Sequence, residues 1–140
     1  MLHDEGEQFF LQVLFTGQEL APANYYLGLD DRTVLLETDT LATVVTNGEP
    51  AGNGYSRLPV AVSPADWTLE QDMSGDWQAV SAIVDWKALG GNIGPVRNLF
   101  LTDVASGTAG VLIASATLTQ QVTLEPGSHL LASMTVKLTE

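Results

Sequence analysis

Clusters of turn-forming residues interrupt this sequence at short intervals, and their spacing constrains the fold more than any other feature. The clusters are Asp30–Arg32, Asn47–Gly54, Asp72–Asp76, Gly90–Pro95, Ala105–Gly110 and Glu125–Gly127. The runs between them are rich in valine, threonine, leucine and aromatic residues, which favour β-strands. About seven or eight such runs, spaced about eight to twelve residues apart, predict an all-β fold, either a β-sandwich or a jelly roll.

The expected strands lie between these turns. They are Asn24–Asp30, Tyr55–Val62, Trp67–Gln71, Trp77–Trp86, Val96–Asp103, Val111–Leu118, Gln120–Leu124 and Leu131–Leu138. Pro59 has no amide hydrogen to donate, so the strand that contains it should lie at a sheet edge or carry a bulge. The stretch Thr33–Thr46 fits a strand or a helix, and the sequence leaves this open.

The 140 residues fit one domain, with a short helical segment over residues 1–20 and a sandwich over residues 21–140. Asp4 and Glu7 are typical of an N-cap and its capping-box partner, and Gly17 is typical of a helix end. The segment between them is apolar nearly all round, so it should be buried against the sheet or a neighbouring subunit. This makes it a candidate contact arm, with the contact residues Phe9, Phe10, Val13 and Leu14.

The charge balance limits the classes of partner. Seventeen acidic residues against five basic ones give a net charge of −12, which repels phosphate backbones, so no nucleic acid is expected. This charge either keeps the free subunit soluble or steers it toward a basic partner. Without cysteine, disulfides and cysteine-ligated zinc are excluded. The acidic start and the short apolar run after it encode neither a signal peptide nor a membrane span.

The sequence contains no recognisable catalytic motif. His3 and His129 stand outside any nucleophile–base pattern, and we expect both at exposed positions without a catalytic role. Asp30 with Asp31, and Asp72 with Asp76, would suit glycosidic chemistry or calcium, but both pairs fall in expected turns, where exposed aspartate is common. We therefore expect no enzyme activity, no cofactor and no metal.

The tryptophans and one glycine-rich segment each allow a binding role and a structural one. Trp67, Trp77 and Trp86 would stack on sugar rings if they lined one face, but core packing is favoured because indoles bury large apolar areas. The Gly52–Gly54 segment lacks the lysine and hydroxyl residue of a phosphate loop and precedes a strand. It is expected to be a turn.

The most specific signal is the run Glu49-Pro50-Ala51-Gly52-Asn53-Gly54-Tyr55-Ser56-Arg57. It resembles the Glu-Pro-Ser-Gly-Asn-Gly-Tyr-Ala-Arg motif of a family of small virion structural proteins of tailed phages and prophages. Further features fall in the family's order from about Asn24 to Leu138, whereas Thr33–Val45 departs from it. These features include Tyr25–Leu29, Trp67, Trp86, Phe100–Asp103, Leu112–Ala116 and Glu125–Gly127.

The resemblance implies binding and not catalysis. It favours a capsid decoration or cement protein that stabilises the head by binding the major capsid protein. Alternatives are another virion partner at the neck or tail, a fibre component, or, from a different class, a carbohydrate-binding module. The expected state is a homo-oligomer, with a trimer favoured, that is made in the host bacterial cytoplasm, resides in the virion and has no membrane partner.

Within the motif, each residue type has an expected physical role. Gly52 and Gly54 allow the backbone to adopt positive φ, which other residues seldom adopt. Tyr55 should turn its ring into the core as the next strand begins. Arg57 should form a structural ion pair or an interface contact, because a rare cation among many acids seldom lacks a carboxylate nearby.

Overall fold

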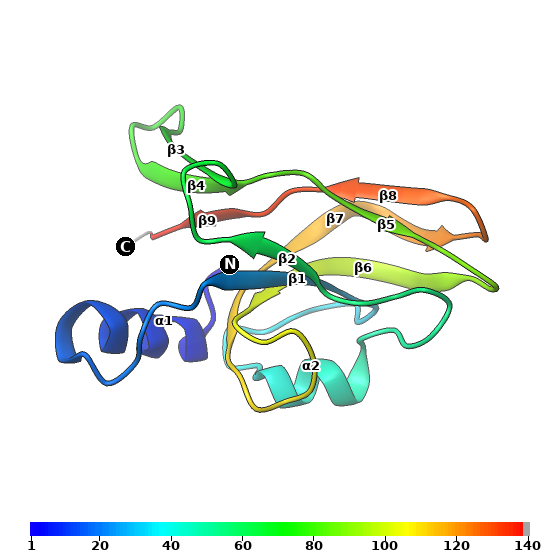
Figure 1. The fold of residues 1–140 in the computed structure, drawn as a ribbon, viewed down its shortest axis with the longest axis horizontal. Helices are drawn as coiled ribbons and strands as arrows, with labels where there is room; N and C mark the ends of the chain where they lie inside the picture. Colours follow the sequence, from blue (N-terminus) through cyan, green and yellow to red (C-terminus); the bar gives the residue numbers. More distant parts are fainter. Residues whose placement is uncertain (139–140) are drawn as a thin grey trace.

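This computed structural model describes residues 1–138 of the chain. These residues contain nine strands and three helical segments, joined by loops (Figure 1). The strands are β1 (Asn24–Asp30), β2 (Leu58–Ala61), β3 (Trp67–Gln71), β4 (Trp77–Ser81), β5 (Val84–Lys87), β6 (Ile93–Thr102), β7 (Leu112–Leu124), β8 (His129–Ala132) and β9 (Thr135–Lys137). The helices are α1 (Asp4–Leu11), the π-helical turn η1 (Gln12–Thr16) and α2 (Leu41–Asn47). The predicted all-β class is confirmed, with α2 as a helix beyond the expected N-terminal one.

Within the described residues the strands form three antiparallel sheets. The largest has the order β2-β1-β6-β7, and the smaller ones are β3-β4-β9 and β5-β8. Both smaller sheets lie on the same side of the largest one and form an interrupted second layer (Figure 1). This arrangement is sandwich-like, as the turn spacing predicts.

The main core lies between these layers and follows from alternation along the strands. Leu27 and Leu29 of β1 stand opposite Leu101 and Leu99 of β6, and all four are almost fully buried. Trp86 of β5 packs in the same cluster from the second layer. Since successive strand residues face opposite sides, this spacing places the large apolar side chains together and out of water.

The opposite face of the largest sheet is covered by α2 (Figure 1). Phe100 of β6 points to this face and packs with Leu41 and Val44 of the helix. A Cβ atom on Gly28 would lie 2.3 Å from the Phe100 ring, so β1 needs glycine there. Thr40 caps the helix through a capping box. The stretch that the sequence left open between strand and helix is therefore helical in its second half.

The N-terminal helix has a different cap from the predicted one. His3 occupies the N-cap position and Asp4 is the first helical residue. The physical reason is that the backbone N–H of His3 donates to the Ile113 carbonyl oxygen of β7 at 2.9 Å, which holds the chain extended up to this point. Gly17, with φ of 65°, ends the helical segment as expected.

Two predicted strands are each divided. The run Trp77–Trp86 forms β4 and β5, and Leu131–Leu138 forms the end of β8 and then β9. β4 pairs with β9, and β5 pairs with β8. The two predicted strands therefore pair with each other in antiparallel fashion, and the hydrogen-bond ladder between them is interrupted at the same place in both. There the Ser81 hydroxyl accepts a hydrogen bond from the backbone N–H of Met134 at 2.8 Å.

The other strands include two exact matches of bounds and one fusion. β1 and β3 have the predicted bounds, and β2 lies at the sheet edge that Pro59 requires. β7 combines Val111–Leu118 with Gln120–Leu124, because its ladder with β6 continues past register shifts. β6 begins at Ile93, inside the predicted turn Gly90–Pro95, since this residue already pairs with the end of β7.

Candidate functional site

The motif from Glu49 to Arg57 is held together by a buried ion pair. Arg57 donates from Nε to Oε1 of Glu49 and from Nη2 to Oε2, each at 2.8 Å. Its Nη1 and Nη2 also donate to the backbone oxygens of Val104 at 3.1 Å and Gly107 at 2.9 Å. Arg57 is 6% exposed. Of its two expected roles, the structural ion pair is therefore the one that this chain forms by itself.

Tyr55 links the motif to β1. Its hydroxyl donates to Oε1 of Glu49 at 2.9 Å and accepts from the backbone N–H of Leu29 at 3.0 Å. Burial, followed by the negative charge of Glu49, raises the pKa of this hydroxyl far above its ordinary value. The ring packs against the main core, as expected.

The turn at the centre of the motif has positive φ at three successive residues. Gly52, Asn53 and Gly54 have φ values of 76°, 56° and 83°. The Asn53 side chain donates to the Asn92 backbone oxygen at 2.8 Å, and its backbone oxygen accepts from the Leu89 N–H at 2.8 Å. The motif thus ties its own turn to the loop before β6, which is a structural role.

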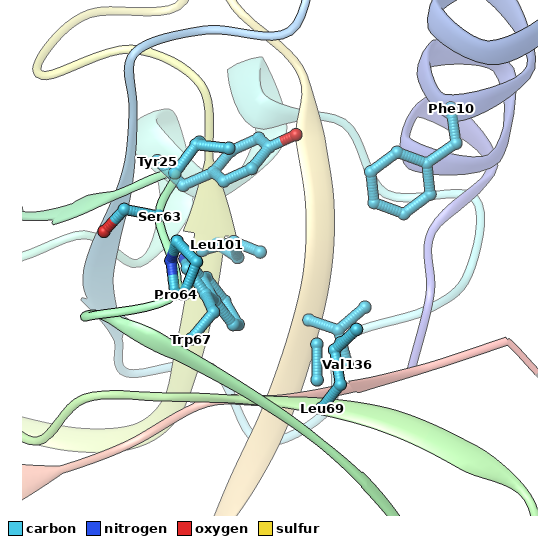
Figure 2. Close-up of a pocket in the computed structure, with 10 residues that line it drawn as sticks. Phe10, Tyr25, Ser63, Pro64, Trp67, Leu69, Leu101 and Val136 are labelled. Carbon is cyan, nitrogen blue, oxygen red and sulfur yellow. The ribbon is translucent and has the colours of Figure 1, made fainter.

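An open apolar groove lies between α1 and the β3-β4-β9 sheet, with a volume of about 610 Å³ (Figure 2). Phe10 projects toward it from α1, and Leu69 and Val136 face it from the sheet. Tyr25 and Trp67 form a further wall, with their rings edge-to-face and 6.3 Å between centroids. Sites that bury a ligand usually measure about 300 to 1,000 Å³, so this groove is large enough to hold part of a partner.

The groove is open because one face of the β3-β4-β9 sheet continues past the main core. Leu69 of β3 stands opposite Ala79 of β4, which stands opposite Val136 of β9, so the three share a face. Near Trp67 this face is partly buried, whereas Leu69 is 72% exposed and Trp77, toward the hairpin tip, is also exposed. A continuous exposed apolar surface of this kind marks an interaction site more often than a chance feature.

The apolar residues that were predicted as contacts have different environments. Phe9 is buried in the main core, so its ring contacts this chain itself. Phe10 lines the groove, Val13 is half-buried against the core, and Leu14 is exposed together with Phe15. Within this chain the helix packs one side on β7 and leaves the other open, so burial against the sheet holds for one side only. Burial of the open side against a neighbouring subunit stays a prediction.

Sequence reasoning missed the rest of the groove. Tyr25, Leu69 and Val136 were placed on strands, but nothing in local alternation shows that these strands meet. The sequence signal that could have found the groove is the presence of large apolar residues, Leu69 and Trp77, at solvent-exposed positions of the β3–β4 hairpin. Folding of the hairpin does not require apolar side chains at these positions.

His3 and Ser115 form a sealed polar pair. Nε2 of His3 lies 2.8 Å from the Ser115 hydroxyl, and Nδ1 lies 3.3 Å from the Glu37 backbone oxygen. Both side chains are buried, so the expectation that His3 is exposed is wrong. The reason is the bridge between Leu2 and Ala114 of β7, which draws the first residues against the sheet. Because solvent does not reach the hydroxyl, a substrate does not reach it either.

Three of the four aspartates in the two predicted pairs are engaged in internal contacts. Asp30 is buried, not exposed in a turn, because Asn98 and Arg32 bind its carboxylate from the α2 side of the sheet. Asp72 and Asp76 both pair with Lys137. The carboxylates of Asp30, Asp72 and Asp76 therefore serve the structure, whereas Asp31 is exposed, as expected of a turn.

Two further sets of titratable groups lie at the surface. His129 is exposed, as expected, and pairs across strands with Asp85 at 2.9 Å. Carboxylate oxygens of Asp4, Glu7 and Glu37 lie within 4.8 Å of one another. This exposed acidic cluster adds negative charge beside α1.

The tryptophans do not form a common sugar-stacking platform. Trp86 is buried in the core, Trp67 is partly buried in the groove wall, and Trp77 is exposed. The expectation of core packing is right for Trp86 and wrong for Trp77, which lies beyond the edge of the core. Nε1 of Trp67 is buried and has no hydrogen-bond partner among residues 1–138.

A scan against models of known protein families finds no match for this sequence, and a search of curated proteins finds none either. None of the helices in the described part of the chain combines the length and apolar character needed to cross a bilayer.

Proposed function

We propose that this chain is a non-enzymatic structural protein of a tailed-phage virion. The proposed role is that of a decoration or cement protein, which binds the major capsid protein and stabilises the head. The chain would act as a homo-oligomer, with a trimer favoured. The observation that carries the binding role is the open apolar groove between α1 and the β3-β4-β9 sheet.

Two features of the structure support a docking role over a catalytic one. The motif that resembles the virion family is internally satisfied: Arg57 and Glu49 bind each other, and Tyr55 binds both Glu49 and Leu29. It therefore acts as a rigid brace and not as a reaction centre. The groove between α1 and the β3-β4-β9 sheet offers apolar area on firm elements, which is what a lasting protein contact uses.

Co-purification with particles tests this proposal. The tagged chain would be produced in the cells that assemble the virions, and particles would be isolated on a density gradient. The expected result is that the chain travels with filled heads in a fixed ratio to the major capsid protein, and that heads lacking it lose DNA at a lower temperature. A chain absent from all particles would overturn the proposal.

The same particles distinguish the alternative positions. Labelled antibody against the tag would decorate the whole head surface for a cement protein. Labelling confined to the neck, the tail or the fibres would assign the chain there and overturn the decoration role. Light scattering of the free chain tests the trimer, because a mass of one subunit would contradict it.

A further inference from the structure

We infer that the groove binds an apolar segment of another protein that carries lysine or arginine at its flanks, and not a second copy of this chain. The inference deepens the proposed function, on which it rests for the groove's docking role. It follows from the distribution of charge around an apolar surface.

Acidic side chains border the lining residues of the groove. Glu7 lies on α1 one helical turn before Phe10. Asp103 acts on Tyr25, since its negative charge adds to the larger effect of burial in raising the pKa of that hydroxyl. The bordering acids are Glu7, Asp66, which precedes Trp67 in the chain, and Asp103. A segment that binds in the groove therefore contacts an apolar lining that is bordered by negatively charged side chains.

The cations of the chain are unable to neutralise these bordering acids. Lys137 is taken up by Asp72 and Asp76 at the tip of the β3–β4 hairpin, and Arg32 and Arg57 pair with carboxylates that do not border the groove. Among residues 1–138 no carboxylate pairs with Lys87 or Arg97, but these lie on β5 and the first half of β6, at the end of the sandwich remote from α1 and the β3–β4 hairpin (Figure 1). The groove end of the molecule thus has unbalanced negative charge.

This charge decides between the occupants of the groove. A second copy would bring another subunit of net charge −12 against the first and place two sets of bordering acids together where water is excluded. Lysine or arginine at the flanks of a partner segment would instead neutralise the acids that border the groove, while the apolar centre of the segment packs on the apolar lining residues. Opposite charges also steer the encounter and increase the association rate. A trimer, if formed, therefore uses another face.

Selection from a library of random short peptides displayed on beads tests the inference without any particle. The probe is the library itself, screened against the purified chain. The expected result is enrichment of peptides with an apolar centre and flanking lysine or arginine, whose affinity falls about tenfold or more between low and physiological salt. Binding should change the fluorescence of Trp67, which lines the groove.

A matched pair of variants locates the binding. Leu69→Lys places a cation in the groove, and Leu131→Lys adds the same charge on β8; the two leucines are 72% and 65% exposed. The selected peptides should bind Leu69→Lys about tenfold or more weaker than the wild-type chain, and Leu131→Lys with unchanged affinity. Circular dichroism would confirm that both variants are folded.

Four results would overturn the inference: no enriched peptides, enriched peptides without basic flanks, equal binding to both variants, or self-association of the wild-type chain that Leu69→Lys abolishes. These results are separable from a failure of the virion role. If the chain is absent from particles but selects basic-flanked apolar peptides through Leu69, the virion role fails and the groove inference stands.

Discussion

Arg57 and Glu49, eight residues apart, bind each other through two parallel hydrogen bonds of 2.8 Å and close the turn between them into a loop. Both side chains are largely shielded from solvent, with 2% and 10% exposure. A bidentate pair in this environment is strong only while both partners are present, because either one alone would be an uncompensated buried charge.

The first prediction concerns this pair. Arg57→Ala should lower the free energy of unfolding by about 3 to 5 kcal/mol, since it leaves the Glu49 carboxylate buried without its partner. Urea denaturation followed by tryptophan fluorescence would measure the loss. Arg97→Ala removes a partly exposed arginine and should change stability by no more than about 0.5 kcal/mol. Similar values for the two variants would show that the pair does not brace the fold.

A second prediction concerns the carboxylate of Glu5, which joins three elements. Its Oε2 accepts from the backbone N–H of Leu41 at 3.0 Å and of Leu112 at 2.7 Å, so α1 holds the start of α2 and of β7. Glu5→Ala would leave both backbone N–H groups without an acceptor. It should lower the free energy of unfolding by about 2 kcal/mol or more, measured by thermal or chemical denaturation. Glu7→Ala, an exposed change on the same helix, serves as the control and should leave stability nearly unchanged.

The third prediction is a loss of stability in mild acid that depends on His3. Burial lowers the pKa of its imidazole below the ordinary value of about 6.5. The unfolded chain therefore takes up this proton first, so the contribution of neutral His3 is fully present above about pH 6.5 and is lost as the pH falls through that value toward the lower folded-state pKa.

Unfolding free energies measured at a series of pH values check this prediction. The wild-type chain and His129→Asn should both lose stability between neutral pH and about pH 5, whereas His3→Asn should lose less across the same interval because it has no proton to take up there. Parallel curves for the wild-type chain and His3→Asn would contradict the assignment.

Local patterns in the sequence predict the strands and turns well. The bounds of β1 and β3, the edge position of Pro59 and the positive φ at Gly52 and Gly54 each follow from one residue type acting on its neighbours. The partner of Arg57 was expected as a carboxylate, although its identity as Glu49 depends on how the turn closes. These features need no knowledge of distant contacts.

Features that depend on distant contacts were not predictable from the sequence. His3 is buried because Leu2 pairs with Ala114, more than a hundred residues away. The division of Trp77–Trp86 into two strands depends on an interruption shared with the last part of the chain. The groove likewise exists because β3, β4 and β9 extend beyond the largest sheet. This extension depends on how the strands are paired and in which register, and the alternation of apolar residues along one strand does not predict it.

The last prediction uses Gly6 to test whether α1 must lie against β7 for the groove to form. A Cβ atom on this residue would come 2.3 Å from the Ile113 carbonyl oxygen, and backbone does not yield as a side chain tip does. Gly6→Ala should therefore displace the helix, cost about 1 to 3 kcal/mol, and shift the emission of Trp67 as Phe10 moves. Gln8→Ala, at an exposed position of α1, should be neutral or slightly stabilising. Unchanged stability and emission in Gly6→Ala would mean that the helix is not seated as described.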